Sequence, residues 1–124
     1  MTNQNLETLS NAELVERFTT LSLKQFDAEY EEDGVRAYTR LYHAIHATSG
    51  VLRARGVEAR MALIPLLKHP NARVRLNAAH ELLAVVPSKA HAVLKDLAET
   101  APGPQRFRAR LALRFLDEGV YKPT

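Results

Sequence analysis

Apolar residues recur along the chain at the three- and four-residue spacing of amphipathic helices, and no segment alternates with the period of a strand. The first stripe begins after Ser10 and Glu13, whose spacing is that of a capping box. A second stripe runs from Tyr38 to Leu52. Gly50 within it indicates close packing or a bend, and Gly56 after it is a natural stop. The pattern therefore predicts a long helical hairpin over residues 10–56.

Shorter helices are expected in the second half, over residues 57–68, 71–86, 88–100 and 104–118. Proline-containing segments separate them. Pro65 lies inside the first of these helices, where it removes one backbone hydrogen bond and should bend the helix. We expect an all-α chain of about six helices in a single domain, with a flexible N-terminus (1–9) and a tail (120–124).

An internal repeat appears when the last two predicted helix pairs are overlaid at an offset of 33 residues. The overlay matches Val74 with Phe107, Arg75 with Arg108, Ala79 with Ala112, Leu82 with Phe115 and Leu83 with Leu116. The stretch 62–83 resembles a HEAT repeat, with a proline in its first helix, a tight turn, and a second helix that opens on Val-Arg. This resemblance implies antiparallel helical hairpins stacked as a short HEAT-like array, with one pair over 57–86 and a degenerate pair over 88–119. Asn71 stands where HEAT turns usually carry an aspartate, so a ladder of Asp–Arg pairs is not expected.

Residues 10–124 as a whole resemble a small bacterial family of domains of unknown function, numbered two thousand and nineteen. The residues that carry the resemblance are Glu13-Leu14-Val15-Glu16-Arg17-Phe18, Glu31-Glu32-Asp33, the HEAT-like stretch, and the ending from Leu116 to Thr124. The resemblance supports the helical fold. It implies no reaction, because the family has no assigned activity.

Composition limits the chemistry that this chain can perform. It contains no cysteine, which excludes disulfides, thiolate metal sites and cysteine nucleophiles. Its 46% hydrophobic and 25% charged residues are typical of a globular domain. Neither a signal peptide nor an apolar run of about 20 residues is present, so we expect a cytoplasmic protein that does not enter a membrane.

The net charge of +3 conceals an asymmetry along the chain. Residues 1–33 carry two basic and eight acidic side chains, a net −6, whereas residues 34–124 carry fifteen and six, a net +9. The acidic run Glu29, Glu31, Glu32 and Asp33 falls where the first long helix should end, and negative charge there opposes the helix dipole. The run is therefore either a solvated loop or a docking site for basic groups.

The arginines of the second half divide into two groups. Arg75 and Arg108 fall near the buried stripe, so their stems should pack between helices. Arg106, Arg110 and Arg114 recur every four residues on the opposite face of the last helix, and the repeat offset places Arg73 beside Arg106. The four predict a basic ridge suited to carboxylates or phosphates, with a solvated basic face as the alternative.

No catalytic, cofactor-binding or metal-binding residue is predicted. His43 and His46 lie three residues apart, but no carboxylate lies one turn away, so we expect two solvent-facing histidines. His80-Glu81 matches part of a zinc-protease motif, but Ala84 stands where its second histidine would be.

These features favour a non-enzymatic protein–protein interaction module. One concrete form is an immunity-like or antitoxin-like protein that blocks a toxin through complementary charge. The alternatives are nucleic-acid binding through the arginine ridge, and an enzyme with a cleft near Glu31, Asp33 and His46. Against nucleic acid, the overall charge excess is small and no aromatic residue is expected to interleave with the exposed arginines. The partner and the oligomeric state stay open.

Overall fold

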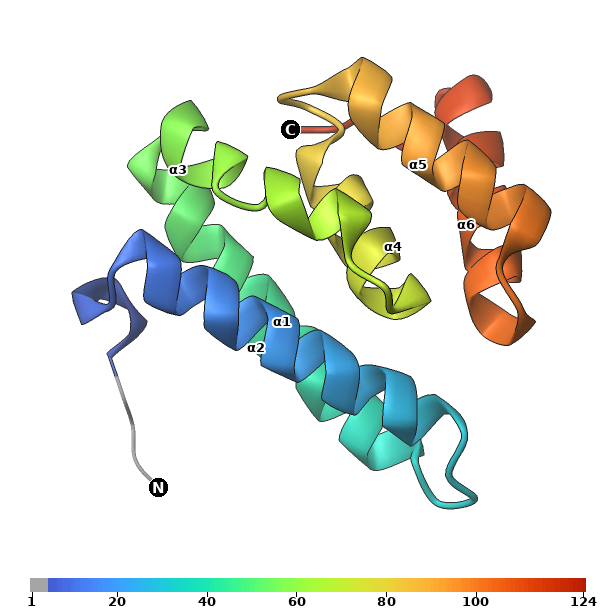
Figure 1. The fold of residues 1–124 in the computed structure, drawn as a ribbon, viewed down its shortest axis with the longest axis horizontal. Helices are drawn as coiled ribbons and strands as arrows, with labels where there is room; N and C mark the ends of the chain where they lie inside the picture. Colours follow the sequence, from blue (N-terminus) through green and yellow to red (C-terminus); the bar gives the residue numbers. More distant parts are fainter. Residues whose placement is uncertain (1–4) are drawn as a thin grey trace. The chain divides into compact units, whose positions relative to one another are not determined.

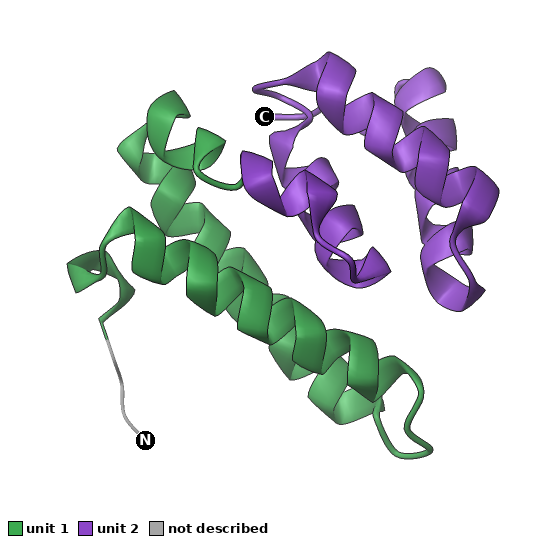
Figure 2. Cartoon of the chain, in the orientation of Figure 1, with its two compact units in different colours: residues 1–63 green, residues 64–124 purple. Residues whose placement is uncertain are grey.

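The fold was analysed in a computed structural model that describes residues 5–124. Its contacts gather into two compact units, residues 1–63 and residues 64–124 (Figure 2). Six α-helices and two 3-10 helices make up the structure, and no strand occurs among the described residues (Figure 1). They are η1 (Leu6–Thr8), α1 (Asn11–Glu29), α2 (Val35–Arg55), α3 (Val57–Met61), η2 (Ile64–Lys68), α4 (Ala72–Leu82), α5 (Pro87–Thr100) and α6 (Gly103–Asp117). The predicted all-α class is confirmed.

The first unit is built on the hairpin of α1 and α2, which run side by side in opposite directions (Figure 1). Leu14 and Phe18 of α1 and Leu52 of α2 are almost completely buried. Burial of each such side chain stabilises the fold by about 1.5–3 kcal/mol. Four polar residues of the two helices are also buried, Ser22, Gln25, Thr48 and Ser49.

The predicted capping box begins α1. The hydroxyl of Ser10 accepts a hydrogen bond from the Glu13 backbone N–H (3.1 Å), and the Ser10 backbone N–H donates to the Glu13 carboxylate (2.9 Å). Two donors that the first helical turn would leave unsatisfied are thereby paired.

Residues 5–9, which we expected to be flexible, are instead held by Arg55 at the end of α2. Its guanidinium donates to the carbonyls of Glu7 (3.0 Å) and Leu9 (2.6 Å) and to the side chain of Asn11 (2.8 Å). Part of the segment predicted to be flexible thus has a long-range partner that local sequence could not reveal, and residues 1–4 lie outside the described part of the chain.

The two glycines of the hairpin behave differently. Gly34 is buried in the α1–α2 turn, and a Cβ atom there would overlap the carbonyl oxygen of Ala28. Gly50 lies within α2, and a Cβ atom there would meet no heavy atom within 4 Å. The prediction of close packing at Gly50 is therefore wrong, and the close approach occurs at Gly34.

The helix predicted over residues 57–68 is broken into α3 and η2. Pro65 has no N–H for the carbonyl of Met61, so the α-helical ladder cannot continue. The chain tightens before it, with the N–H groups of Ala62 and Leu63 bonded to carbonyls three residues back. The boundary between the two units falls at this break.

The second unit packs α4 against η2, α5 and α6. Asn71 caps α4 as predicted, since its side-chain oxygen accepts hydrogen bonds from the N–H groups of Arg73 (2.8 Å) and Val74 (3.2 Å). The α-helix ends at Leu82 rather than 86, and residues 83–85 continue as a turn in which the N–H groups of Val85 and Val86 bond the carbonyl of Leu82. Pro87 disfavours helical backbone at Val86, so the helix could not continue through residue 86. The core consists of Val74, Leu82, Leu94, Leu97 and Ala109 with their neighbours. The HEAT-like relation between residues 57–86 and 88–119 stays a prediction.

We predict opposite effects of alanine at the two hairpin glycines. Gly34→Ala should lower the free energy of unfolding by about 1–3 kcal/mol, because its Cβ atom collides with backbone that cannot move aside. Gly50→Ala should raise it by about 0.5–1 kcal/mol, because alanine favours the helix and meets no neighbour. Urea unfolding of the two variants measures both changes, and equal effects would contradict the contrast in packing.

We also predict an acid-sensitive contribution from Glu13. The hydrogen bond from the Ser10 backbone N–H, assisted by the Ser10 side chain, holds the pKa of Glu13 below its usual 4.5. A carboxyl whose pKa is lower in the folded state stabilises the fold above its unfolded pKa, and this contribution disappears as the pH falls through the folded value. Glu13→Gln should therefore be less stable than the wild type at pH 7, and the difference should shrink on acidification below about pH 4.5. Urea titrations at several pH values test this, with Glu16→Gln on the same exposed helix surface as the control. A pH-independent difference would show that the Glu13 charge plays no part.

Candidate functional site

The turn between α5 and α6 brings two arginines to one carbonyl oxygen. In a continuing helix the carbonyl of Ala98 would accept the N–H of residue 102, but Pro102 has none. The Nε atoms of Arg106 (3.3 Å) and Arg110 (3.1 Å) donate to that carbonyl instead. Because both reach the same oxygen at the negative end of α5, the two guanidinium groups are neighbours.

The face of α6 turned to solvent is both aromatic and basic. Gln105 and Ala109 are completely buried, whereas Phe107 on the opposite side is 65% exposed. Leu111 and Phe115 follow Phe107 at four-residue intervals, and Phe115 remains 36% exposed. We call Phe107, Leu111 and Phe115, with the flanking Arg106, Arg110 and Arg114, the α6 face.

The 33-residue overlay pairs Phe107 with Val74 and Phe115 with Leu82, but the structure leaves both phenylalanines exposed. Their partners in the overlay, Val74 and Leu82, are fully buried because α4 contacts η2, α5 and α6. Within the described residues, no element covers the corresponding side chains of α6 to the same extent, and Phe107 and Phe115 stay exposed. We expected no aromatic side chain among the exposed arginines; this expectation is wrong, because Phe107 and Phe115 are exposed there.

The predicted ridge of four arginines does not form as a set. Arg73 is buried, only 4% exposed, and its guanidinium lies 3.5 Å from the side-chain oxygen of Asn77. Arg108, expected near the core, is exposed. Arg114 is exposed as predicted and forms a surface ion pair with Glu118 (3.1 Å). The basic group on α6 thus comprises Arg106, Arg110 and Arg114, without Arg73.

The tail after α6 folds back onto the same unit. The N–H groups of Val120 and Tyr121 donate to the carbonyl of Phe115, and Gly119 adopts the positive φ that this turn requires. The Tyr121 ring stacks on His80 of α4, with ring centroids 4.8 Å apart. The end of the α6 face is therefore held by a local helix cap at Gly119 and by the long-range contact between Tyr121 and His80.

The acidic run lies in the α1–α2 turn, where Glu31, Glu32 and Asp33 are exposed. Glu29 is the last residue of α1 and is half-buried. The run opposes the dipole of α1, but it also immediately precedes the N-terminus of α2, where negative charge is favourable. Gly34, the N-cap of α2, has no side chain to cap that end. A local structural role thus accounts for part of this charge.

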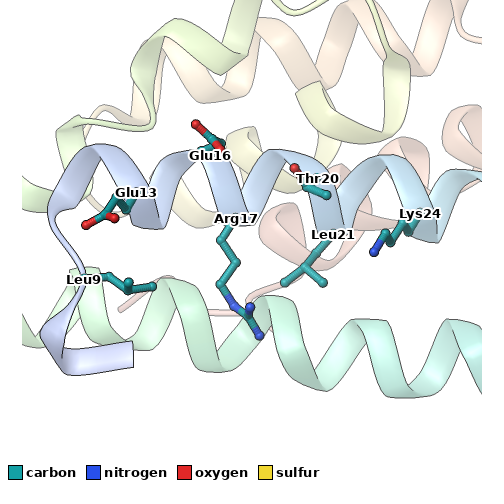
Figure 3. Close-up of a pocket in the computed structure, with 7 residues that line it drawn as sticks. All are labelled: Leu9, Glu13, Glu16, Arg17, Thr20, Leu21 and Lys24. Carbon is teal, nitrogen blue, oxygen red and sulfur yellow. The ribbon is translucent and has the colours of Figure 1, made fainter. Parts of the chain in front are cut away.

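A shallow groove of about 300 Å³ lies along α1 (Figure 3). Its lining residues are Leu9, Glu13, Glu16, Arg17, Thr20, Leu21 and Lys24. Arg17 extends toward α2, where its Nε atom donates to the hydroxyl of Thr48 (3.3 Å), as Figure 3 shows in part. The carboxylate of Glu13 is engaged in the capping box. Glu31, Asp33 and His46, which the enzyme alternative required around a cleft, do not line this groove.

His43 and His46 are both exposed, as expected, and lie beside the Tyr42 ring at centroid distances of 5.5 and 4.5 Å. Within residues 5–124, no three histidine or carboxylate side chains gather closely enough to hold a metal ion. The described helices also include none with the length and apolar character needed to cross a membrane.

We predict that Arg106 and Arg110 stabilise the second unit jointly. The double variant Arg106→Ala/Arg110→Ala should lose about 1–3 kcal/mol of unfolding free energy, because the Ala98 carbonyl loses both charged donors. Each single variant should lose much less than half of that, since the remaining arginine still satisfies the oxygen. Arg114→Ala is the matched control and should change stability by less than about 1 kcal/mol, because it breaks only an exposed ion pair. Additive single losses in urea unfolding would contradict the shared acceptor.

Comparison with known proteins identifies the family of this chain. The family model described as a domain of unknown function (DUF2019) matches residues 12–117. The crystal structure of the protein RPA1889 from Rhodopseudomonas palustris CGA009 is similar, with a TM-score of 0.92 and 32% sequence identity over 98% of this chain and 100% of that chain. No curated protein matches the chain. The family resemblance noted in the sequence is thus confirmed, and the chain belongs to the DUF2019 family.

Proposed function

We propose that this protein is a non-enzymatic interaction module that binds another protein through the α6 face. The observation that carries the proposal is Phe107, a large aromatic side chain left 65% exposed in the middle of a helix. An aromatic side chain there is costly unless a partner covers it.

The residue types around Phe107 are those that dominate protein interfaces. Aromatic residues and arginine are enriched at the centres of such interfaces, where truncation costs most binding energy. On α6 these types stand together: Phe107 and Phe115 lie among Arg106, Arg110 and Arg114. The second unit carries ten basic and five acidic side chains, a net +5, which favours a partner with an acidic surface. An immunity-like or antitoxin-like role is one form of this function.

Nucleic-acid binding is the second candidate, and the exposure of Phe107 and Phe115 favours it. Aromatic rings beside arginines form stacking platforms for unpaired bases. Against it, Glu99 and Glu118 are exposed near both ends of the basic group, where they would repel a continuous phosphate backbone. This mixed charge makes a protein partner the better match.

A capture experiment with matched variants tests the proposal. Wild-type protein, Phe107→Glu and the control Val57→Glu are immobilised and exposed to nuclease-treated lysate of the source organism. Val57 is a similarly exposed apolar residue, 59%, in the first unit. We expect one or more proteins retained by the wild type and the control but at least tenfold less by Phe107→Glu, since a charge replaces the central anchor.

The identified partner is then purified and titrated against the same three proteins. Equal affinity of Phe107→Glu and the wild type would overturn the α6 face as the binding surface. Retention that occurs only in a parallel lysate without nuclease treatment, with a steep fall of affinity in salt for added duplex or single-stranded DNA, would establish the nucleic-acid candidate instead. All variants should unfold at the wild-type temperature, because the substituted side chains are largely exposed.

A further inference from the structure

We propose that Arg106 and Arg110 form a preorganised carboxylate-binding site, which holds an acidic side chain of the protein partner beside Phe107. This inference rests on the proposed function and specifies the chemistry of the partner. It starts from the shared hydrogen bond to the carbonyl of Ala98, which fixes two flexible side chains in adjacent positions.

The anchoring contact uses only one edge of each guanidinium. An arginine has five N–H donors, and the Nε–H alone reaches the carbonyl of Ala98 in both residues. No hydrogen bond or ion pair within the described residues engages the remaining Nη groups of Arg106 or Arg110. Both side chains are exposed, so these donors are available to a ligand.

The two positive charges repel each other, and the negative end of α5 offsets this only in part. An anion between the Nη groups would neutralise both charges and accept bidentate hydrogen bonds, the geometry for which guanidinium is best suited. Because the Nε contacts already restrict both side chains, binding loses less side-chain entropy than it would with free arginines. The fold thus supplies a site that two unanchored surface arginines would not.

The surroundings favour a carboxylate on a protein over a polyphosphate. Phe107 lies one turn before Arg110 and Leu111, so an apolar side chain adjoins the guanidinium pair. Asp96 and Glu99 are exposed on the last turns of α5, close in sequence to Ala98. A single carboxylate flanked by apolar side chains fits this arrangement, whereas a chain of phosphates would meet the two acidic side chains.

The test uses a defined peptide in place of the unidentified partner. An alanine-based helical peptide carries two glutamates four residues apart with a leucine between them on the same face, and its control carries glutamine at both positions. Binding of each labelled peptide to the full-length protein is followed by fluorescence anisotropy, and the arginine Nε–H signals by NMR. We expect the wild type to bind the glutamate peptide at least about tenfold more tightly than the glutamine peptide, with shifts at Arg106 and Arg110.

Variants then separate the site from general charge. The double variant Arg106→Lys/Arg110→Lys keeps both charges but removes the planar guanidinium groups, so it should lose the preference for the glutamate peptide. Arg114→Lys should keep that preference. Phe107→Ser leaves the α5 contact intact and should weaken both peptides, so the proposal stays testable even if the lysine variant unfolds. A wild type that binds both peptides equally, or a lysine variant that retains the preference, overturns the carboxylate site.

Two further measurements identify the anion that binds and distinguish failure of the carboxylate site from failure of the proposed function. Inorganic phosphate and duplex DNA compete with the glutamate peptide in the same assay, and tighter binding of duplex DNA than of peptide would overturn a protein carboxylate as the ligand. Absence of glutamate preference together with Phe107-dependent capture of a protein would refute the carboxylate site while leaving the α6 face as an interaction surface.

Discussion

Helix ends shape this structure more than any other feature, because each end leaves backbone groups that the helix itself cannot satisfy. In the second half of the chain, prolines leave further backbone carbonyls without their helical N–H donors. Pro65 removes the N–H that the Met61 carbonyl needs, and Pro102 does the same to Ala98. In the first case the chain tightens into a 3-10 helix, and in the second it recruits Arg106 and Arg110.

Arginine is the residue that completes these ends from a distance. Arg55 holds the segment before α1 through two carbonyls, and Arg75 donates to the carbonyl of His69 (3.1 Å). A guanidinium is suited to this work because it carries five donors and stays charged. The arginines of this chain therefore have structural partners as well as surface charge, and the α6 pair combines both because only its Nε edges are engaged.

The charge asymmetry of the chain also has a local explanation in part. Glu31, Glu32 and Asp33 stand just before α2, whose first turn lacks a side-chain cap. Their negative charge interacts favourably with the positive end of the α2 dipole and partly replaces the missing side-chain cap. On α6, Arg106 and Arg110 bind the Ala98 carbonyl and Arg114 pairs with Glu118, and with exposed Phe107 among them these arginines form the surface on which a partner is expected.

The sequence by itself determined the helical class, the capping of α1 by Ser10 and Glu13, the capping of α4 by Asn71, and the family, because these depend on local patterns of a few neighbouring residues. Sequence reasoning did not predict the burial and the hydrogen-bond partners of side chains that depend on residues distant in the chain. The 33-residue overlay pairs Phe107 with Val74, yet only Val74 is buried, because α4 packs against η2, α5 and α6 whereas Phe107 lies on the side of α6 away from the buried Gln105 and Ala109. The same holds for Arg73, buried by its surroundings, and for Arg106 and Arg110, which share a carbonyl that only the folded α5–α6 turn brings within reach. Burial and long-range pairing are properties of the packed unit, so only the tertiary structure decided which arginines and aromatic side chains form the α6 face.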